Sequence, residues 1–241
     1  MKNELTLTFA GQAGFIIQTK SGYRIGVDLY LSDCCERYFG FKRLMPYIFN
    51  ASELNLDLLI ATHAHYDHFD PDSVPIIMSD KKTHLLLAFD AMNEAGRLNL
   101  DSKRITYIKE GNTFKNSDVT VKAMPCDHGK DTPFAIGLLI TVDDKSIYIA
   151  GDTAYRVDYF LNNELKDLDV MIMPINGAFG NMNEYEGARA VDIVKPKLAI
   201  PCHYWNFAEH GGNPAIFASE MKDKYNNHNF ILMRPGETIC L

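Results

Sequence analysis

The residues best suited to chemistry stand in one short segment, His63-Ala64-His65-Tyr66-Asp67-His68. They directly follow Leu58–Ala61, a continuous apolar run that predicts a strand buried on both faces. Residues i and i+2 of an extended segment share a face, so His63 and His65 can hold one metal ion. A turn after them would direct Asp67 and His68 to a second ion. The alternative is a solvated polar loop that carries histidines by chance.

Three further residues of the same types lie at or just beyond predicted strand ends, namely His128, Asp152 and His203. Taken singly, each is more typical of an ordinary core or surface residue, but all three are expected at the same edge of the fold as the histidine-rich segment. Imidazole nitrogen and carboxylate oxygen, without thiolate, suit zinc, manganese or iron. Divalent ions held in this way activate water and polarise a carbonyl or phosphoryl oxygen, which is the chemistry of hydrolysis.

Four residues that follow this last histidine are candidate substrate contacts, namely Tyr204, Trp205, Asn206 and His210. Asn206 is able to donate to a developing oxyanion, whereas Trp205 is equally suited to a core position. The segment from Arg37 to Arg43 combines three cations with three aromatic residues. It predicts either a lid that receives an anionic substrate or a solvated loop with its aromatic rings tucked underneath.

The elements that must position these residues begin with hairpin-forming strands and continue with strands that alternate with helices. The predicted strands are 5–9, 15–19, 23–27, 58–61, 84–89, 105–108, 119–124, 134–142, 146–150, 170–173, 198–201 and 230–233. The predicted helices are 73–78, 90–98, 159–165, 185–194 and 215–225. This order predicts a fold of the α/β (α+β) class, in which two mixed sheets pack together and helices lie outside them. No linker or repeat divides residues 1–241, so we expect a single domain.

Composition narrows the classes of partner and location. The 241 residues carry a formal net charge of -7, which argues against a nucleic-acid backbone as the main partner. The five cysteines lack the spacing of a metal ribbon or a disulfide framework. The N-terminal segment lacks the apolar core of a signal peptide, and no run approaches the roughly 18 apolar residues of a membrane span. We therefore expect a cytoplasmic protein that binds neither nucleic acid nor membrane.

The histidine-rich segment resembles the His-x-His-x-Asp-His signature of the metallo-β-lactamase superfamily, and the three strand-end residues match the remaining ligands of that family in chain order. The resemblance covers nearly the whole chain. It implies a four-layer αββα sandwich, the metallo-β-lactamase fold, and two divalent metal ions. By this similarity, one ion would be held by His63, His65 and His128, the other by Asp67, His68 and His203, and both by a bridging Asp152.

Within the superfamily, the chain looks most like the branch of L-ascorbate-6-phosphate lactonases and related predicted metal-dependent hydrolases. Residues 151–153 and 200–207 carry this likeness. We expect hydrolysis of a carboxylic ester or lactone of a small cytoplasmic metabolite, with Asp67 and Asp152 as catalytic residues and zinc as the first choice of metal.

Two alternatives remain open. One is a phosphodiesterase or other phosphoesterase on the same fold, and the other is a metal-binding protein without activity. In either hydrolase the expected partner is a small-molecule substrate, which would be anionic if the segment from Arg37 to Arg43 serves as a lid. A homo-oligomer is compatible with the sequence.

Overall fold

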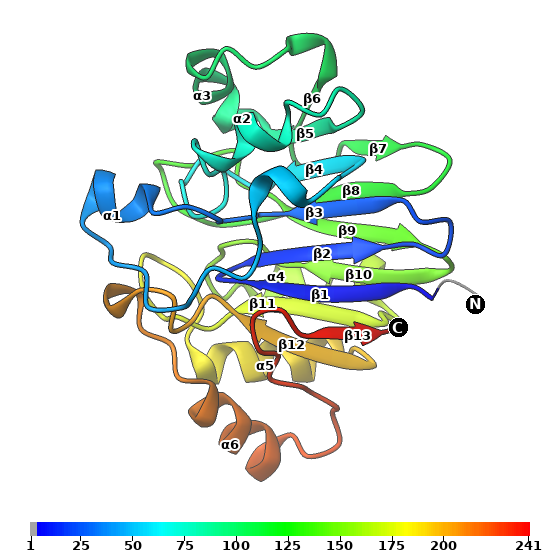
Figure 1. The fold of residues 1–241 in the computed structure, drawn as a ribbon. Helices are drawn as coiled ribbons and strands as arrows, with labels where there is room; N and C mark the ends of the chain where they lie inside the picture. The colour runs from blue at the N-terminus through cyan, green and yellow to red at the C-terminus, as the bar shows by residue number, and fades with distance from the viewer. Residues whose placement is uncertain (1–3) are drawn as a thin grey trace.

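The computed structural model describes residues 4–241 and consists of two β-sheets packed face to face (Figure 1). The first sheet has the strand order β13 (Thr238–Cys240), β1 (Thr6–Gly11), β2 (Gly14–Gln18), β3 (Arg24–Val27), β4 (Leu58–Ala61), β5 (His84–Ala88) and β6 (Ile105–Ile108). The second has the order β12 (Leu198–Cys202), β11 (Val170–Pro174), β10 (Lys145–Ile149), β9 (Gly137–Val142), β8 (Thr120–Met124) and β7 (Thr113–Lys115).

Both sheets change from antiparallel to parallel pairing part-way across. Strands β1 to β3 are antiparallel, and β3 to β6 are parallel. Strands β7 to β10 are antiparallel, and β10 to β12 are parallel. In sheets of this kind, ligand sites form beyond the carboxyl ends of the strands. The loops that follow β4 and β12 both lie on the side of the molecule away from the C-terminus (Figure 1).

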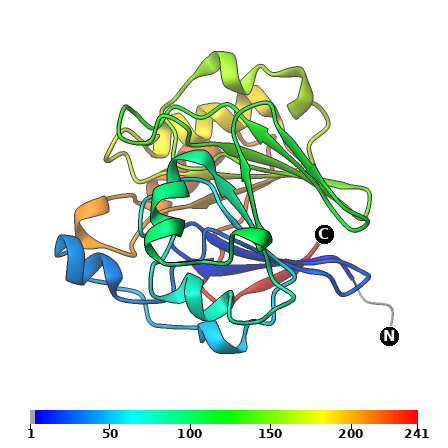
Figure 2. The same cartoon turned by 90° about the horizontal axis from the view of Figure 1, so that it is seen from above.

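Helices cover the outer face of each sheet, which gives the four layers of an αββα sandwich (Figure 2). The first sheet carries α2 (Ser73–Ile77) and α3 (Met92–Arg97), and the second carries α4 (Val157–Phe160), α5 (Glu184–Val194) and α6 (Pro214–Lys224). A further helix, α1 (Cys34–Phe39), lies beyond the ends of the strands of the first sheet (Figure 1). Short 3-10 turns are η1 (Ala51–Glu53), η2 (Phe89–Ala91), η3 (Ser102–Arg104), η4 (Asn163–Leu165) and η5 (Ala208–His210). The predicted fold class is confirmed.

Alternation along the strands explains how both faces of a sheet are buried. In β9, Leu138, Ile140 and Val142 point into the core between the sheets, while Leu139 packs against the helices outside.

Among the helices of residues 4–241, none is long and apolar enough to cross a membrane.

The long helix α5 shows how the sequence sets an element boundary. The Asn183 side chain accepts a hydrogen bond from the Glu186 backbone N–H, and the Glu186 carboxylate accepts one from the Asn183 N–H, both at 3.0 Å. This capping box satisfies two helix-end donors at once. The helix predicted at 185–194 is correct to within one residue.

Two predicted elements are wrong in part. Residues 230–233 form no strand but a single bridge between Phe230 and Ala199 of β12. Pro201, two residues further along β12, has no N–H to continue the ladder, and β13 instead forms the edge of the other sheet. The helix predicted at 159–165 is split into α4 and η4. The segment expected to be a lid or a loop begins within α1, which sequence patterning did not predict.

Candidate metal centre

The seven predicted ligands come from four loops, each of which follows a strand. The loop after β4 supplies four of them, and the loops after β8, β10 and β12 supply one each, as His128, Asp152 and His203. Six of the seven side chains are buried, and His65 is the least buried. The structure brings these side chains, which were expected at one edge of the fold, close to one another.

Three histidines form the first group. The Nδ1 atom of His65 lies 3.1 Å from Nε2 of His63 and 3.0 Å from Nε2 of His128. Two nitrogens bound at about 2.0–2.1 Å to one tetrahedral zinc ion would stand roughly 3.3 Å apart. The spacing of the three ring nitrogens therefore fits a single divalent ion.

A second group gathers around Asp152. Its Oδ2 atom lies 3.0 Å from Nε2 of His203, and its Oδ1 atom lies 3.3 Å from Nε2 of His68. The Oδ2 atom of Asp67 lies 3.2 Å from the same His203 nitrogen. Asp152 also approaches the first group, since its Oδ2 is 3.8 Å from Nε2 of His128. This carboxylate thus stands between the two groups, where a bridging ligand is expected.

Two atoms of this second group test whether a metal suits the residues present. Nε2 of His68 and Oδ1 of Asp152 are buried 3.3 Å apart, and neither atom has a hydrogen bond of good geometry. A buried polar atom without a partner costs about 1–3 kcal/mol, so native proteins seldom keep one without a reason. Both atoms point into the cluster, and coordination of a divalent ion would satisfy them. The donor set therefore fits the metal that the sequence predicts.

Burial sets the protonation of the first group. It lowers the pKa of His63 well below its ordinary value, lowers that of His65, and lowers that of His128 to about 4. Neighbouring histidines act in the same direction on all three. These imidazoles are therefore neutral at pH 7, and their lone pairs are free to bind a cation.

Carboxylates reverse the effect of burial in the second group. Burial disfavours the charged form of His68 and His203, but Asp152 and Asp67 outweigh it, so the pKa of His68 is raised well above its ordinary value and that of His203 to about 9. Burial likewise opposes ionisation of Asp67 and Asp152, yet the two histidines hold both carboxyl pKa values well below their usual range. A metal ion binding here must displace protons from the histidines.

Asp28 and Thr62 support ligands of both groups, and the sequence analysis did not single out either. The Asp28 carboxylate accepts from the Thr62 N–H at 2.8 Å, from the Thr62 hydroxyl at 2.7 Å and from Nδ1 of His68 at 2.9 Å. Because the Thr62 hydroxyl donates to Asp28, it is left to accept from Nδ1 of His63, 3.1 Å away. Each hydrogen bond fixes a ring so that its Nε2 faces the centre. Asp28 directly follows β3, so the strand-end signal could have found it.

Gln12 is a second residue that sequence reasoning missed. It lies in the tight turn between β1 and β2 with a φ of 55°, and its side chain is 1% exposed. Its Nε2 donates to Oδ2 of Asp67 at 2.8 Å, and its backbone carbonyl accepts from the His203 N–H at 2.8 Å. It thereby ties a ligand of one sheet to a ligand of the other. A lone glutamine in a hairpin gives no signal in the sequence that could have revealed this role.

His210 is the one predicted substrate contact that reaches the centre. Its ring is parallel to that of His203, with centroids 5.3 Å apart, and both of its ring nitrogens are buried without a partner. Ligand atoms of Asp67, His203 and His210 lie within 4.8 Å of one another. Burial lowers the pKa of His210 to about 4, so the ring is neutral. It offers either a substrate contact or an additional metal donor.

The other three predicted contacts, Tyr204, Trp205 and Asn206, do not line the cavity over the cluster, and their contact with substrate stays a prediction. Tyr204 packs with the helices outside the second sheet, and Trp205 is 55% exposed. Asn206 is fully buried, and neither of its side-chain amide atoms has a partner. The physical reason is local, since positive φ values at His203 and Trp205 reverse the chain directly after the ligand.

The two arginines of the segment from Arg37 to Arg43 are engaged elsewhere, and its lysine, Lys42, is exposed outside the cavity lining. Arg37 forms an ion pair with Asp72. Arg43 donates to the carbonyls of Tyr30 and Ser32 and lies 4.1 Å from the Tyr30 ring centroid. Neither guanidinium is placed to receive a substrate anion.

A cavity of about 190 Å³ opens over the cluster. Its walls include five of the predicted ligands, and the remaining lining residues are Cys35, Phe39, Phe41, Tyr66, Phe179 and His210. The candidate metal centre is thus reachable from outside through a largely aromatic opening.

The protein has two packed mixed sheets and a buried cluster of histidine and aspartate side chains beyond the strand ends. This combination is that of the metallo-β-lactamase fold with a candidate metal site. The chain matches the family described as beta-lactamase superfamily domain over residues 6–203, and it belongs to this superfamily.

Relatives give the same class. A UPF0173 metal-dependent hydrolase of Sulfurisphaera tokodaii is 29% identical over 198 residues, which cover 81% of this chain and 86% of the relative. A metallo hydrolase of Ignicoccus hospitalis has a similar structure, with a TM-score of 0.77 and 22% identity over 98% of both chains. A possible metal-dependent hydrolase of Veillonella parvula gives a TM-score of 0.80 at 18% identity, covering 99% of this chain and 100% of the other. The chain is therefore a predicted metal-dependent hydrolase.

Proposed function

We propose that this protein hydrolyses a carboxylic ester or lactone of a small cytoplasmic metabolite with the help of two divalent ions, zinc being the first choice. The observation that carries the proposal is the convergence of seven histidine and aspartate side chains, with unpartnered buried donor atoms, under one cavity. The likeness to L-ascorbate-6-phosphate lactonases noted in the sequence motivates the choice of bond.

The residues divide between the ions as follows in this proposal. The first ion is held by His63, His65 and His128, the second by Asp67, His68 and His203, and Asp152 bridges them. Bound divalent ions would supply an activated water and would polarise the substrate carbonyl.

Within the protein, Asp67 is the residue best placed to move a proton. It lines the cavity, and Gln12 and His203 fix its Oδ2 atom. A carboxylate held in this way can orient the attacking water or pass a proton to the leaving group. Asp152 lies between the two groups of ligands, and its proposed role is to hold both ions. Asp28 and Thr62 keep the ligand rings in the orientation that hydrolysis requires.

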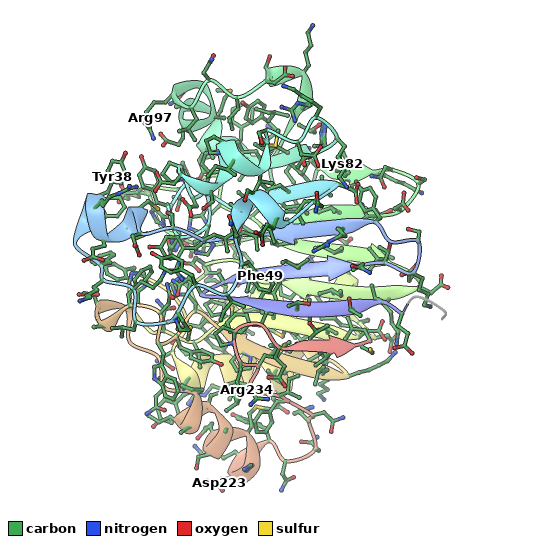
Figure 3. All side chains as sticks on the ribbon, viewed as in Figure 1. Tyr38, Phe49, Lys82, Arg97, Asp223 and Arg234 are labelled. Carbon is green, nitrogen blue, oxygen red and sulfur yellow. The ribbon has the colours of Figure 1, made fainter. Side chains whose placement is uncertain are left out.

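The test uses a panel of esters, lactones and phosphoesters with zinc-loaded protein and with an Asp152→Ala variant. We expect turnover of at least one ester or lactone and its loss by about a hundredfold to a thousandfold in the variant, because electrostatic groups at the reacting centre typically contribute this much. The matched control is Asp223→Ala, a carboxylate on α6 at the far end of the molecule (Figure 3). Hydrolysis that is unchanged by Asp152→Ala would contradict the proposal, as would turnover of phosphoesters alone.

A further inference from the structure

The part of the cavity that does not belong to the metal cluster is almost entirely aromatic. Phe41 lies 6.1 Å from Phe39 and 5.8 Å from Phe179, measured between ring centroids, and Phe39 lies 5.6 Å from Tyr66. The His210 ring closes the inner side, 5.1 Å from Phe41 and 4.9 Å from Phe179. Phe39 and Phe41 come from the end of α1 and the residues just after it, whereas Tyr66, Phe179 and His210 come from three other segments. The fold therefore assembles the wall from distant parts of the chain.

Two of these rings are exposed although they are large and apolar. Phe39 is 56% exposed and Phe179 is 58% exposed. Exposed apolar surface at the rim of a cavity is typical of a binding site, because a ligand can cover it. Aromatic rings also give a rigid contact surface at a small entropic cost.

Charge is missing from the same wall. Within residues 4–241, no lysine or arginine lines the cavity. Of the cations nearest in sequence, Arg37 pairs with Asp72 and Arg43 with backbone carbonyls. Lys42 is exposed and lies outside the cavity lining. Arg97, at the end of α3 (Figure 3), pairs with Glu94. A phosphate or carboxylate on the distal part of a substrate would therefore lose its water without gaining a cation.

The volume sets the size of the group that fits. An apolar cavity of roughly 150 Å³ holds one benzene molecule, and the present cavity is about 190 Å³. The volume therefore admits at most one ring-sized group.

We propose that Phe39, Phe41 and Phe179 form an apolar subsite for an uncharged, ring-sized substituent of the substrate. The substrate class is thus an ester or lactone with an aryl or short branched apolar group, rather than a phosphorylated or carboxylated metabolite. This inference rests on the proposed function, because the substituent is placed relative to the metal centre.

The experiment measures binding rather than turnover. Zinc-loaded protein is titrated calorimetrically with acetohydroxamate, phenylacetohydroxamate and succinate monohydroxamate, which share one metal-chelating head and differ only in the tail. We expect the phenyl tail to tighten binding at least about tenfold over the methyl group, as apolar pockets typically discriminate. The carboxylate tail should bind no more tightly than the methyl group.

Variants assign the preference to the rings. Phe39→Ala combined with Phe179→Ala should bring the phenyl advantage to within about twofold of unity and leave acetohydroxamate affinity nearly unchanged. Both side chains are more than half exposed, so the variant is expected to fold. The control is Tyr185→Ala, an exposed aromatic residue on α5 outside the cavity lining.

The outcomes separate the two proposals. Equal affinity for all three hydroxamates, a preference for the carboxylate tail, or a phenyl preference that survives the double substitution overturns the subsite. A protein that shows the phenyl preference but hydrolyses none of the esters and lactones supports the subsite and refutes the proposed hydrolysis.

Discussion

Asp28 is predicted to control both halves of the metal centre although it contacts no substrate. Its Oδ2 atom accepts from the Thr62 hydroxyl at 2.7 Å and from Nδ1 of His68 at 2.9 Å. In an Asp28→Asn variant, the amide NH₂ takes the place of one of the two carboxylate oxygens, and at the Oδ2 position it would face two donors. The Thr62 hydroxyl would then turn to accept from the amide and donate to Nδ1 of His63, which moves the ring proton to the Nε2 that should bind metal. His68 would lose its acceptor altogether.

The magnitude follows from these contacts. Loss of a hydrogen bond to a charged group costs about 1.5–3 kcal/mol, and loss of a partner that orients a metal ligand costs about 10–100-fold in metal affinity. Because one substitution disturbs a ligand of each group, we expect both binding events to weaken. The assay is zinc titration in competition with a chromophoric chelator, compared between native protein and Asp28→Asn.

Asp70→Asn provides the matched control for this prediction. Asp70 is also fully buried, and its carboxylate accepts from Leu31, Ser32 and Ser73, none of which is a predicted ligand. This variant should lower the free energy of unfolding and leave zinc affinity within about threefold of native, since no ligand ring changes its partner. Native-like zinc affinity in Asp28→Asn, or equal losses in the two variants, would refute the reasoning.

Three other predictions concern the pKa of His203, the effect of zinc on stability and the N-terminal cap of α5. The pKa of His203, raised from 6.5 to about 9, contributes stability below pH 6.5 that is lost as pH rises through about 9, on the order of 3 kcal/mol. Urea denaturation of metal-free protein should show this loss, and stability that is constant or rising over that window would contradict it. Zinc at a hundredfold excess over its dissociation constant should stabilise the protein by about 2.7 kcal/mol for each site, seen as a higher melting temperature that a chelator reverses; an unchanged melting temperature would argue against metal binding. Asn183→Ala should cost about 1 kcal/mol of unfolding free energy through the lost cap of α5 with zinc affinity unchanged, and a weaker zinc affinity would show that α5 affects the site.

The metal cluster was predictable because its members follow strands. A continuous apolar run locates β4 in the sequence, and a polar residue directly after such a run must lie at the sheet edge. His203 and Asp28 directly follow β12 and β3, and the rule applies to both. Asp152 and His128 follow their strands by three and four residues, so the rule indicates them only approximately. Local sequence therefore contains most of the information needed to place these side chains.

Contacts that depend on the pairing of distant segments were not predictable in this way. Gln12 reaches Asp67 only because the β1–β2 turn meets the loops after β4 and β12. Tyr204 and Trp205 adjoin a predicted ligand in sequence, yet positive φ values at His203 and Trp205 turn the chain away from the cavity. The aromatic wall formed by Phe39, Phe41 and Phe179 joins loops more than 130 residues apart in the chain, and periodicity in a single sequence does not report such contacts.

The central claim is tested most directly by locating the metals themselves. Crystals of zinc-loaded protein, measured on both sides of the zinc absorption edge, should show two anomalous peaks in the cavity. One should be bound by His63, His65 and His128, and the other by Asp67, His68 and His203, with Asp152 touching both. Anomalous peaks elsewhere, or a saturated crystal in which these side chains bind no ion, would contradict the account.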